Sequence, residues 1–298
     1  MTAVIVGHTS MLGVALKHQL DQVGEPYLTA GRSADSDIYF NLSVQPPTLS
    51  KFPTFLPSID TIYYLPSSFE SDNCSGFNKN LLVNSAGVGY AVMLAELFKP
   101  KALIYSGTIS SYSGFDPYRG LSSYGLTKRI AEELLDWCAN KFGFRFASVR
   151  FSQLFDDAGM CISHQPWIGR IIRYAFEKDA LYMPSSEGKR NFLHVQDASR
   201  LLLDVSRNSE LSGILNGCST QQHSYTELAH TAFSFNECID RLHISSTKQP
   251  FRPICLPEEK TLYELLNQEA MISPSTWIQN ISTLKSWSSF GPMDVKKS

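Results

Sequence analysis

Three side chains near the middle of the chain could together move a proton. Tyr124 and Lys128 are four residues apart, so on a helix they share one face. An ammonium beside a phenol favours the phenolate, and this lowers the phenol pKa from its reference of about 10. We therefore expect Tyr124 to act as a general acid or base near neutral pH. A hydroxyl from Thr108 or Ser106 would orient the oxygen that exchanges this proton.

The spacing of this pair is not specific by itself. Tyr174 and Lys178 have the same separation, but no hydroxyl at the end of a strand accompanies them. We interpret that second pair as a packing tyrosine and a surface lysine. A purely structural role remains the alternative for Tyr124 and Lys128 as well.

The first thirteen residues are typical of a strand, a tight turn and a helix start. Gly7 allows the chain to leave the strand with a positive φ, and Gly13 allows the helix to pack closely against the strand. Backbone N–H groups and the helix dipole between them would face an anion. Ser10 stands where a third glycine is expected. The pattern predicts a pyrophosphate site, with a structural turn as the alternative, at Gly7, Thr9, Ser10, Met11, Leu12 and Gly13.

The end of the second predicted strand bears on the choice of cofactor. NAD-binding sheets usually place a carboxylate there, whereas this chain reads Gly31-Arg32-Ser33. A guanidinium can grip a 2′-phosphate with two hydrogen bonds, so Arg32 favours NADP(H). NAD(H) remains possible, because Asp35 and Asp37 follow closely. A solvated surface arginine is the alternative interpretation.

The elements that must position these groups alternate between strands and helices, which predicts an α/β fold with a Rossmann-type, doubly wound parallel sheet. Such sheets bind ligands beyond the carboxyl ends of their strands. We expect a dinucleotide-binding domain at 1–150 and, at 151–298, a smaller α+β substrate-binding lobe interleaved with it. The predicted strands are 3–6, 27–30, 38–40, 61–65, 102–105 and 146–151, and the predicted helices of the first half are 11–23, 84–98 and 121–141. In the last helix we expect inward positions at Ile130, Leu134, Leu135 and Trp137.

Composition excludes some classes of partner. The 298 residues carry a net charge of −2 and include no strongly basic run, so we expect neither nucleic acid nor an anionic membrane as a partner. The six cysteines lack a C-x-x-C pair and no histidine cluster accompanies them, which favours buried free thiols and no metal site. No apolar span of 18 residues or basic leader is apparent, so we expect a cytoplasmic protein.

At these residues the chain resembles the extended short-chain dehydrogenase/reductase family, specifically its NAD(P)-dependent epimerase/dehydratase group, which acts on nucleotide sugars. The glycine turn is similar to G-x-x-G-x-x-G, and the pair of Tyr124 and Lys128 is similar to Y-x-x-x-K. Four further segments are similar to family motifs: N-x-x-G at 84–87, a strand running into S-S-x-x-x-Y-G at 105–112, R-x-x-N at 150–153 and G-x-x-R-D-F-x-H-V-x-D at 188–197.

The resemblance implies a role for each residue. The catalytic group would be Thr108, Tyr124 and Lys128. Besides the turn, Arg32, Tyr124 and Lys128, the cofactor would contact Asn41, Leu42, Leu65, Pro66, Ser106 and Phe151. The substrate would contact Ser67, Thr108 and Gln153, and its diphosphate would bind Arg190. The resemblance also implies that a homodimer is possible through the helices at 84–98 and 121–141.

Departures from the family pattern exclude some of the reactions that the family catalyses. Ile109 and Ser110 follow the catalytic threonine where 4,6-dehydratases carry Asp-Glu, and elimination of water needs that acid. Ser110 also stands where fucose-synthase-type enzymes use a cysteine. We therefore expect an NADP(H)-dependent oxidoreductase that reduces a 4-keto nucleoside-diphosphate sugar. The alternatives are a nucleotide-sugar epimerase and a non-catalytic NADP-sensing regulator.

Overall fold

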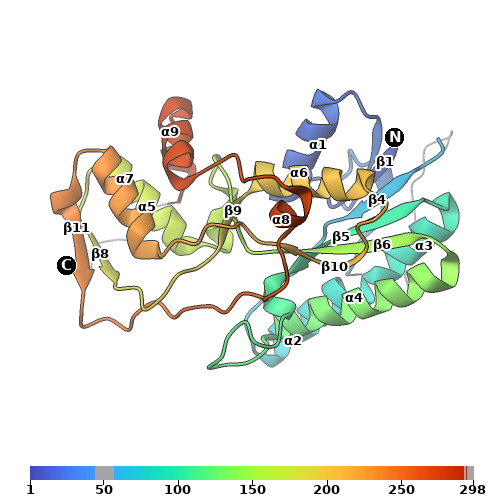
Figure 1. Cartoon of the computed structure of the whole chain (residues 1–298), viewed down its shortest axis with the longest axis horizontal. Coiled ribbons are helices and arrows are strands. Elements are labelled where there is room, and N and C mark those ends of the chain that lie inside the picture. The colour runs from blue at the N-terminus through green and yellow to red at the C-terminus, as the bar shows by residue number, and fades with distance from the viewer. Residues whose placement is uncertain (44–56, 292, 294–298) are drawn as a thin grey trace. The chain divides into compact units, whose positions relative to one another are not determined.

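The chain forms two compact units in the computed structural model, which describes residues 1–43, 57–291 and 293 (Figure 1). The first unit comprises Met1–Phe151, Ala198–Gly217 and Leu256–Leu262. The second comprises Ser152–Asp197, Cys218–Cys255 and Tyr263–Ser298. The chain therefore passes between the two units several times.

The first unit is built on a seven-stranded sheet in which all neighbouring strands are parallel. Its strand order is β10-β6-β5-β4-β1-β2-β3. The chain leaves β1 toward one edge and returns at β4 toward the other, so the strand order reverses between them, where such sheets bind ligands. The strands are β1 Ala3–Val6, β2 Tyr27–Gly31, β3 Ile38–Tyr39, β4 Thr61–Tyr64, β5 Ala102–Thr108, β6 Arg145–Phe151 and β10 Gly213–Gly217.

Helices cover both faces of this sheet, which confirms the predicted α/β, doubly wound Rossmann-type fold. Figure 1 shows α1 (Met11–Gln22) and α6 (Val195–Arg207) over one face, and α3 (Val88–Phe98) and α4 (Ser123–Phe142) over the other. The strands are apolar on both faces because both are covered. Val4, Ile62 and Leu103 are completely buried in the core beneath α3 and α4.

The inward face of α4 differs from the prediction. Leu135 is buried, but Leu134 and Trp137 are 43% and 62% exposed. The buried stripe instead includes Lys128 and Glu132, two charged residues that a hydrophobic pattern does not find. The expected inward positions at 134 and 137 are therefore wrong.

A helical stretch precedes β5 and is not one regular helix. It consists of α2 (Cys74–Asn80), a π-helical segment (Leu81–Ala86) and α3. By length and composition alone, Cys74–Phe98 is apolar enough to cross a membrane, so the expectation of no such span is wrong. A core helix passes the same test, and α3 contributes Tyr90 and Leu94 to the buried core.

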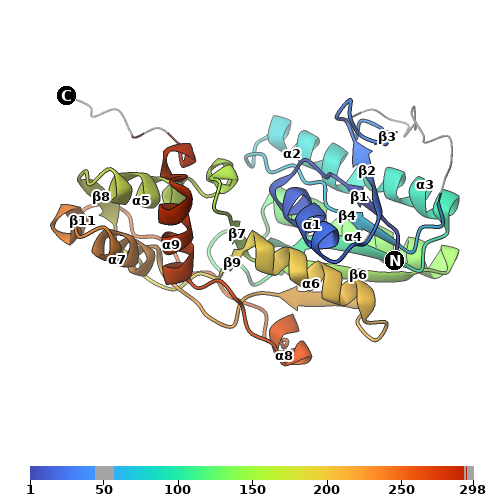
Figure 2. The ribbon, with the colours of Figure 1, turned by 90° about the horizontal axis from the view of Figure 1, so that it is seen from above.

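The second unit contains two small parallel ladders and several packed helices (Figure 2). Ser224 and Glu227 form a capping box at the start of α7. The elements are β7 Gln153–Phe155 paired with β9 Phe192–His194, β8 Leu181–Pro184 paired with β11 Leu242–Ser245, and helices α5 Pro166–Phe176, α7 Tyr225–Phe235, α8 Leu262–Leu266 and α9 Pro274–Leu284.

All six cysteines are free, as expected from their spacing. Cys138, Cys161, Cys218 and Cys238 are buried. Cys74 and Cys255 are exposed, so the expectation of buried thiols is wrong for these two. Cys74 is the first residue of α2, and Cys255 lies in a segment without regular secondary structure.

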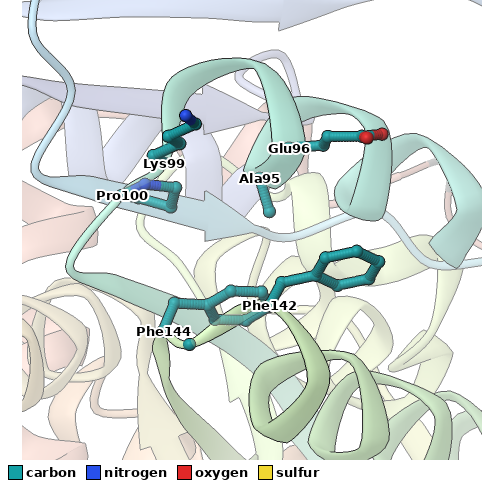
Figure 3. A pocket seen from close by; sticks show the side chains of 7 residues that line it. Ala95, Glu96, Lys99, Pro100, Phe142 and Phe144 are labelled. Atoms are coloured by element: carbon teal, nitrogen blue, oxygen red, sulfur yellow. The ribbon is translucent and has the colours of Figure 1, made fainter.

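A cavity of about 180 Å³ lies at the amino ends of β5 and β6 (Figure 3). Lys99 and Pro100 come just before β5, and Phe144 comes just before β6. The residues expected to do chemistry follow the opposite, carboxyl ends of the strands. The cavity is lined by Ala95, Glu96, Lys99, Pro100, Phe142, Gly143 and Phe144.

Candidate active site in the first unit

The turn after β1 depends on two glycines. Gly7 has φ +83°, a conformation that disfavours other residues, and it lies against Pro66. A Cβ on Gly13 would lie 2.5 Å from the carbonyl oxygen of Gly7 and 2.8 Å from the Cα of His8. The expected conformational roles of both glycines are confirmed.

Ser10 explains why a third glycine is unnecessary. Its φ of −70° and ψ of 161° are open to any residue, and its Oγ accepts a hydrogen bond from Gly13 N at 3.1 Å. Ser10 is thus the N-cap of α1. Thr9 is exposed, Met11 is partly buried, and Leu12 is buried in the core. The N-terminus of α1, with its unpaired backbone N–H groups, remains suited to an anion.

The carboxylates after β2 are engaged within their own turn. Asp37 accepts hydrogen bonds from Thr29 N and Thr29 Oγ1, both at 2.8 Å. Asp35 accepts one from the hydroxyl of Ser33, which lowers the pKa of its carboxyl group. The side chain of Arg32 is exposed.

The segment after β3 is anchored to α3. Phe40 stacks on Tyr90 with ring centroids 4.5 Å apart, and the Tyr90 hydroxyl donates to the carbonyl oxygen of Asn41 at 2.8 Å. Leu42 is partly buried against the core. Asn41 and Leu42 are therefore held in place at the same sheet edge as the glycine turn.

Further predicted cofactor residues occupy neighbouring strand ends. Leu65 is buried, and its backbone N–H donates to Val6. Ser106 Oγ donates to the carbonyl oxygen of Leu65 at 3.4 Å. Phe151 is buried at the end of β6, where it pairs in register with Thr108. The first unit thus brings together the predicted cofactor residues at the carboxyl ends of its strands.

Tyr124 lies in the first turn of α4, close to two hydroxyls from neighbouring strand ends. Ser67 Oγ lies 3.4 Å from the phenol oxygen, and the Thr108 side chain also forms a hydrogen bond with this phenol. Phe69 packs edge-on against the Tyr124 ring at 4.8 Å. Phe69 is 54% exposed, and no motif in the sequence marks it.

Gly125 accounts for the close approach of α4 to β5. A Cβ at this position would overlap the carbonyl oxygen of Ser110, in the short 3₁₀ turn Ile109–Ser111. Ser122 Oγ caps the helix by accepting from Gly125 N at 3.1 Å, and Ser111 Oγ donates to Gly125 O at 3.1 Å. A glycine directly after Tyr124 was the available signal, and sequence reasoning missed it.

In the cofactor-free protein, the pKa values of Tyr124 and Lys128 differ from those expected. Burial raises the pKa of Tyr124, while hydrogen bonds from Ser67 and Thr108 oppose this rise and Glu132 adds to it. Burial lowers the pKa of Lys128 to about 7, against the attraction of Glu132. The Lys128 ammonium lies 4.2 Å from the centre of the Tyr105 ring. The expected lowering of the phenol pKa is therefore wrong for the free protein, because burial outweighs the hydrogen bonds from Ser67 and Thr108.

A buried ion pair lies beside Lys128. Arg150 Nη2 lies 2.6 Å from Glu132 Oε2, and Arg150 Nε lies 3.0 Å from Oε1. Ser148 Oγ donates to the same carboxylate at 2.6 Å. Gly107 makes room for this cluster, because a Cβ there would overlap Ser148 Oγ and lie 2.8 Å from Glu132 Oε1.

Comparison with known families agrees with this arrangement. Residues 3–216 match the NAD dependent epimerase/dehydratase family. The chain belongs to this family. Membership indicates a nicotinamide-dependent enzyme of the epimerase/dehydratase type, as the resemblance of the sequence implied. No curated protein sequence matches the chain.

Solved structures share the fold over nearly the whole chain. UDP-N-acetylglucosamine 4-epimerase from Bacillus cereus has a TM-score of 0.72 at 20% identity, covering 99% of this chain and 98% of that one. RMD from Pseudomonas aeruginosa complexed with NADPH has a TM-score of 0.76 at 16% identity, and the match covers 96% of this chain and 99% of that one. UDP-glucose 4-epimerase from Thermotoga maritima, with UDP-glucose, has a TM-score of 0.69 at 13% identity, and the match covers 96% of this chain and 99% of that one.

The residues of the first unit fit the cofactor of the family. The turn at Gly7 and Gly13 brings backbone to the N-terminus of α1 without side-chain obstruction, as a pyrophosphate requires. Lys128 is 1% exposed, and its ammonium finds no hydrogen-bond partner among the residues that the structure describes. Such a buried donor suits the ribose hydroxyls of a dinucleotide.

The two substrate residues predicted from the second unit meet at a tyrosine. Gln153 Nε2 donates to Tyr225 Oη at 3.2 Å and to Gln165 Oε1 at 2.9 Å. Arg190 lies over the Tyr225 ring, 5.3 Å from its centre. Gln153 Oε1 and Arg190 Nε are buried without a hydrogen-bond partner in the described part of the chain. The sequence analysis missed both Gln165 and Tyr225, which lie outside the family motifs.

Proposed function

We propose that this protein is an NADP(H)-dependent reductase of a 4-keto nucleoside-diphosphate sugar. The first unit would bind the cofactor, and the second would bind the sugar nucleotide. One observation carries the proposal: the Tyr124 phenol lies against the hydroxyls of Ser67 and Thr108 at the carboxyl ends of β4 and β5. A phenol and an orienting hydroxyl at that edge of a dinucleotide-binding sheet suit proton transfer to a carbonyl oxygen.

Each side chain has a step that follows from its surroundings. The cofactor, when bound, supplies a hydride to the ketone carbon. Tyr124 donates its proton to the ketone oxygen, and its raised pKa keeps the phenol protonated at neutral pH. Thr108 donates a hydrogen bond that orients this oxygen. Lys128, one helical turn further along, holds the ribose hydroxyls.

The surroundings of β2 support NADP(H) over NAD(H). A carboxylate that binds ribose hydroxyls would repel a 2′-phosphate. Asp37 is already bonded to Thr29, and Asp35 to Ser33, while Arg32 is exposed at the same turn. The similar structures contain NADPH in some cases and NAD in others, so this preference rests on the residues after β2.

The substrate class rests on the second unit. Arg190 would bind the diphosphate, with Gln153 contacting the substrate beside it. The buried, unpartnered Nε of Arg190 and Oε1 of Gln153 support polar contacts with a ligand. The similar structure from Thermotoga maritima contains UDP-glucose.

Epimerization of a nucleotide sugar is the second candidate, because the same residues could first remove and then return a proton. Two of the three similar structures described above are 4-epimerases. An epimerase of this type keeps its cofactor bound through turnover. Protein purified without added cofactor would then carry a stoichiometric nicotinamide dinucleotide, whereas a reductase must release it.

The deciding experiment follows NADPH absorbance with 4-keto sugars linked to dTDP, GDP, CDP or UDP. We expect turnover with at least one of them. Replacement Tyr124→Phe should lower kcat by about 10²–10⁴-fold, because it removes only the proton donor. The thermal shift produced by NADPH should persist in this variant. Wild-type turnover by Tyr124→Phe would overturn the assigned role. NADP binding without any turnover would favour an NADP-sensing regulator.

We also infer a cytoplasmic homodimer. Leu126, Leu134 and Trp137 are exposed along α4, at helical spacings of eight and three residues. They form an apolar stripe on the outer face of a helix whose inner face covers the sheet. A second copy of the chain would remove this stripe from water.

A further inference from the structure

A buried histidine in the glycine turn lies against the turn that follows β2. His8 comes directly after Gly7 and is 4% exposed. Its Nε2 lies 2.9 Å from Ser36 Oγ, and a Cβ on Gly31 would lie 3.8 Å from its Cδ2. The imidazole therefore joins the turn after β1 to the turn after β2, which carries Arg32.

The second ring nitrogen of His8 is not used by the fold. Nδ1 is buried and finds no hydrogen-bond partner among the residues that the structure describes. A polar atom buried without a hydrogen bond destabilises the folded state. An apolar side chain would fill the same space without this penalty. Packing alone therefore does not account for an imidazole at this position.

Charged groups from two elements act on the His8 ring. Burial lowers the pKa of His8, and Lys17 on α1 lowers it further, whereas Asp35 and Asp37 after β2 raise it. In the cofactor-free protein the imidazole is therefore neutral at neutral pH. The effect of the two carboxylates shows that a negative charge in the turn after β2 favours the protonated ring. Arg32 precedes both carboxylates in that turn.

We propose that His8 takes up a proton when a dinucleotide with a 2′-phosphate binds, and so helps the protein to discriminate NADP(H) from NAD(H). This inference rests on the proposed preference for NADP(H), in which Arg32 binds the 2′-phosphate. That phosphate adds a charge of about −1.5 to −2 to the turn that holds Asp35 and Asp37. The proton comes from solvent and binds Nδ1, while Nε2 donates to Ser36. His8 acts through its charge and needs no direct contact with the phosphate.

Proton uptake by His8 gives the affinity for the cofactor a definite pH dependence. A ligand that raises the pKa of a group binds more tightly as the pH falls toward the pKa of the free protein. The contribution of His8 to NADP⁺ binding should therefore grow between pH 8 and pH 6.5. The 2′-phosphate has a second pKa of about 6, and its protonation weakens binding to Arg32 in the opposite sense. A variant without the imidazole separates the two effects.

The test compares His8→Gln with His18→Gln. Glutamine can keep a hydrogen bond to Ser36 but does not titrate, and His18 is an exposed histidine on α1. Isothermal titration calorimetry with NADP⁺ and NAD⁺, in two buffers of different ionisation enthalpy, measures affinity and proton uptake. We expect His8→Gln to take up fewer protons with NADP⁺ than the wild type. Its NADP⁺ affinity should fall about 3-fold or more at pH 6.5 and less than about 2-fold at pH 8. His18→Gln should match the wild type, and NAD⁺ should show no such difference between variants.

NMR titration of the imidazole measures the proposed protonation directly. The pKa of His8, assigned by comparison with His8→Gln, should be higher in the NADP⁺ complex than in the NAD⁺ complex. If His8→Gln does not fold, assignment through the backbone of the wild type keeps this measurement. Equal pKa values of His8 in the two complexes would overturn the inference. Binding of NAD⁺ without binding of NADP⁺ would contradict the proposed cofactor preference and the inference together. A protein that shows the expected pKa difference but reduces no ketone would contradict the proposed reaction alone.

Discussion

The side chain of Lys128 is buried, and burying a positive charge destabilises the folded protein. It is 1% exposed, and burial lowers its pKa to about 7 from a model-compound value of 10.5. The folded state therefore binds this proton more weakly than the unfolded state does. The resulting loss of stability is fully present below about pH 7 and is relieved as the pH rises toward 10.5. A site that tolerates such a group has use for its charge or its proton.

Replacement Lys128→Met should reveal this cost. We expect the variant to be more stable than the wild type, and by a larger margin at pH 6 than at pH 9.5. Urea unfolding of the cofactor-free protein at both values measures the margin. The effects of other titrating groups cancel in the difference between variant and wild type. An equal margin at the two pH values would show that Lys128 titrates normally in the folded protein.

Glu132 and Arg150 form a buried ion pair, and we expect the loss of either partner to destabilise the fold. Its side chains are 2% and 17% exposed, so losing one partner leaves the other charge buried alone. We expect Glu132→Gln to lower the free energy of unfolding by about 3–5 kcal/mol. Denaturant unfolding measures this loss, and the double variant Glu132→Gln/Arg150→Met should recover part of it.

An exposed pair one residue away provides the control. Arg129 and Glu133 form an i,i+4 pair on the outer surface of α4, with side chains 44% and 69% exposed. Glu133→Gln should change stability by less than about 0.5 kcal/mol. Similar losses from Glu132→Gln and Glu133→Gln would mean that burial does not govern the inner pair.

At the scale of elements, the position of the first turn of α4 determines whether the Tyr124 phenol lies next to the Thr108 hydroxyl. Gly125 permits the helix to approach the carbonyl oxygen of Ser110, and a methyl group there would overlap that oxygen. We expect Gly125→Ala to displace the first turn of α4, to lower Tm by several degrees and to reduce kcat by about 100-fold. Thermal unfolding and NADPH oxidation measure the two effects.

A glycine with more space provides the comparison for stability. A Cβ at Gly31 would meet its nearest atoms at 3.8 Å, which is ordinary contact, and Gly31 has no positive φ. Gly31→Ala should therefore leave Tm within about a degree of the wild type. Full activity in Gly125→Ala would show that α4 reaches Tyr124's position without the close contact.

The sequence was informative where a function depends on residues that are close along the chain. Gly7, Gly13 and the end of β5 could be located because a strand, a turn and a helix start occupy a dozen residues. The sheet followed from the alternation of strands and helices. Ser10 as a helix cap was also accessible in principle, because a serine three residues before a helical Gly13 is a capping pattern.

Features that depend on distant segments could not be found in this way. The hydrogen bonds of Asn80 and Asn84 join a loop ten or more residues earlier in the chain to a helix 43 residues later. The pKa of Tyr124 depends on burial, which spacing does not reveal. The inner face of α4 was misjudged because Lys128 and Glu132 occupy it, and hydrophobic periodicity treats charged residues as exposed.

At the scale of the whole molecule, the proposed function would divide two kinds of recognition between the two units. The glycine turn and Tyr124 belong to the first unit, and the cluster of Gln153, Arg190 and Tyr225 belongs to the second. A nicotinamide dinucleotide and a nucleotide sugar each carry a diphosphate. Under this proposal, one diphosphate would be bound by backbone at a helix start and the other by a guanidinium.

The exposed apolar stripe on α4, formed by Leu126, Leu134 and Trp137, predicts a dimer, because association would remove these side chains from water. Trp137 is 62% exposed and Leu134 is 43% exposed, on a helix whose opposite face is fully packed. Replacement Trp137→Glu would place a charge within the proposed dimer contact. We expect light scattering after size exclusion to give a dimer for the wild type and a monomer for Trp137→Glu. Trp167→Glu, in the other unit, should leave the mass unchanged, and a wild-type monomer at micromolar concentration would contradict the proposal. Because Tyr124 lies thirteen residues before Trp137 on the same helix, a dimer through α4 would also hold the start of that helix against β5.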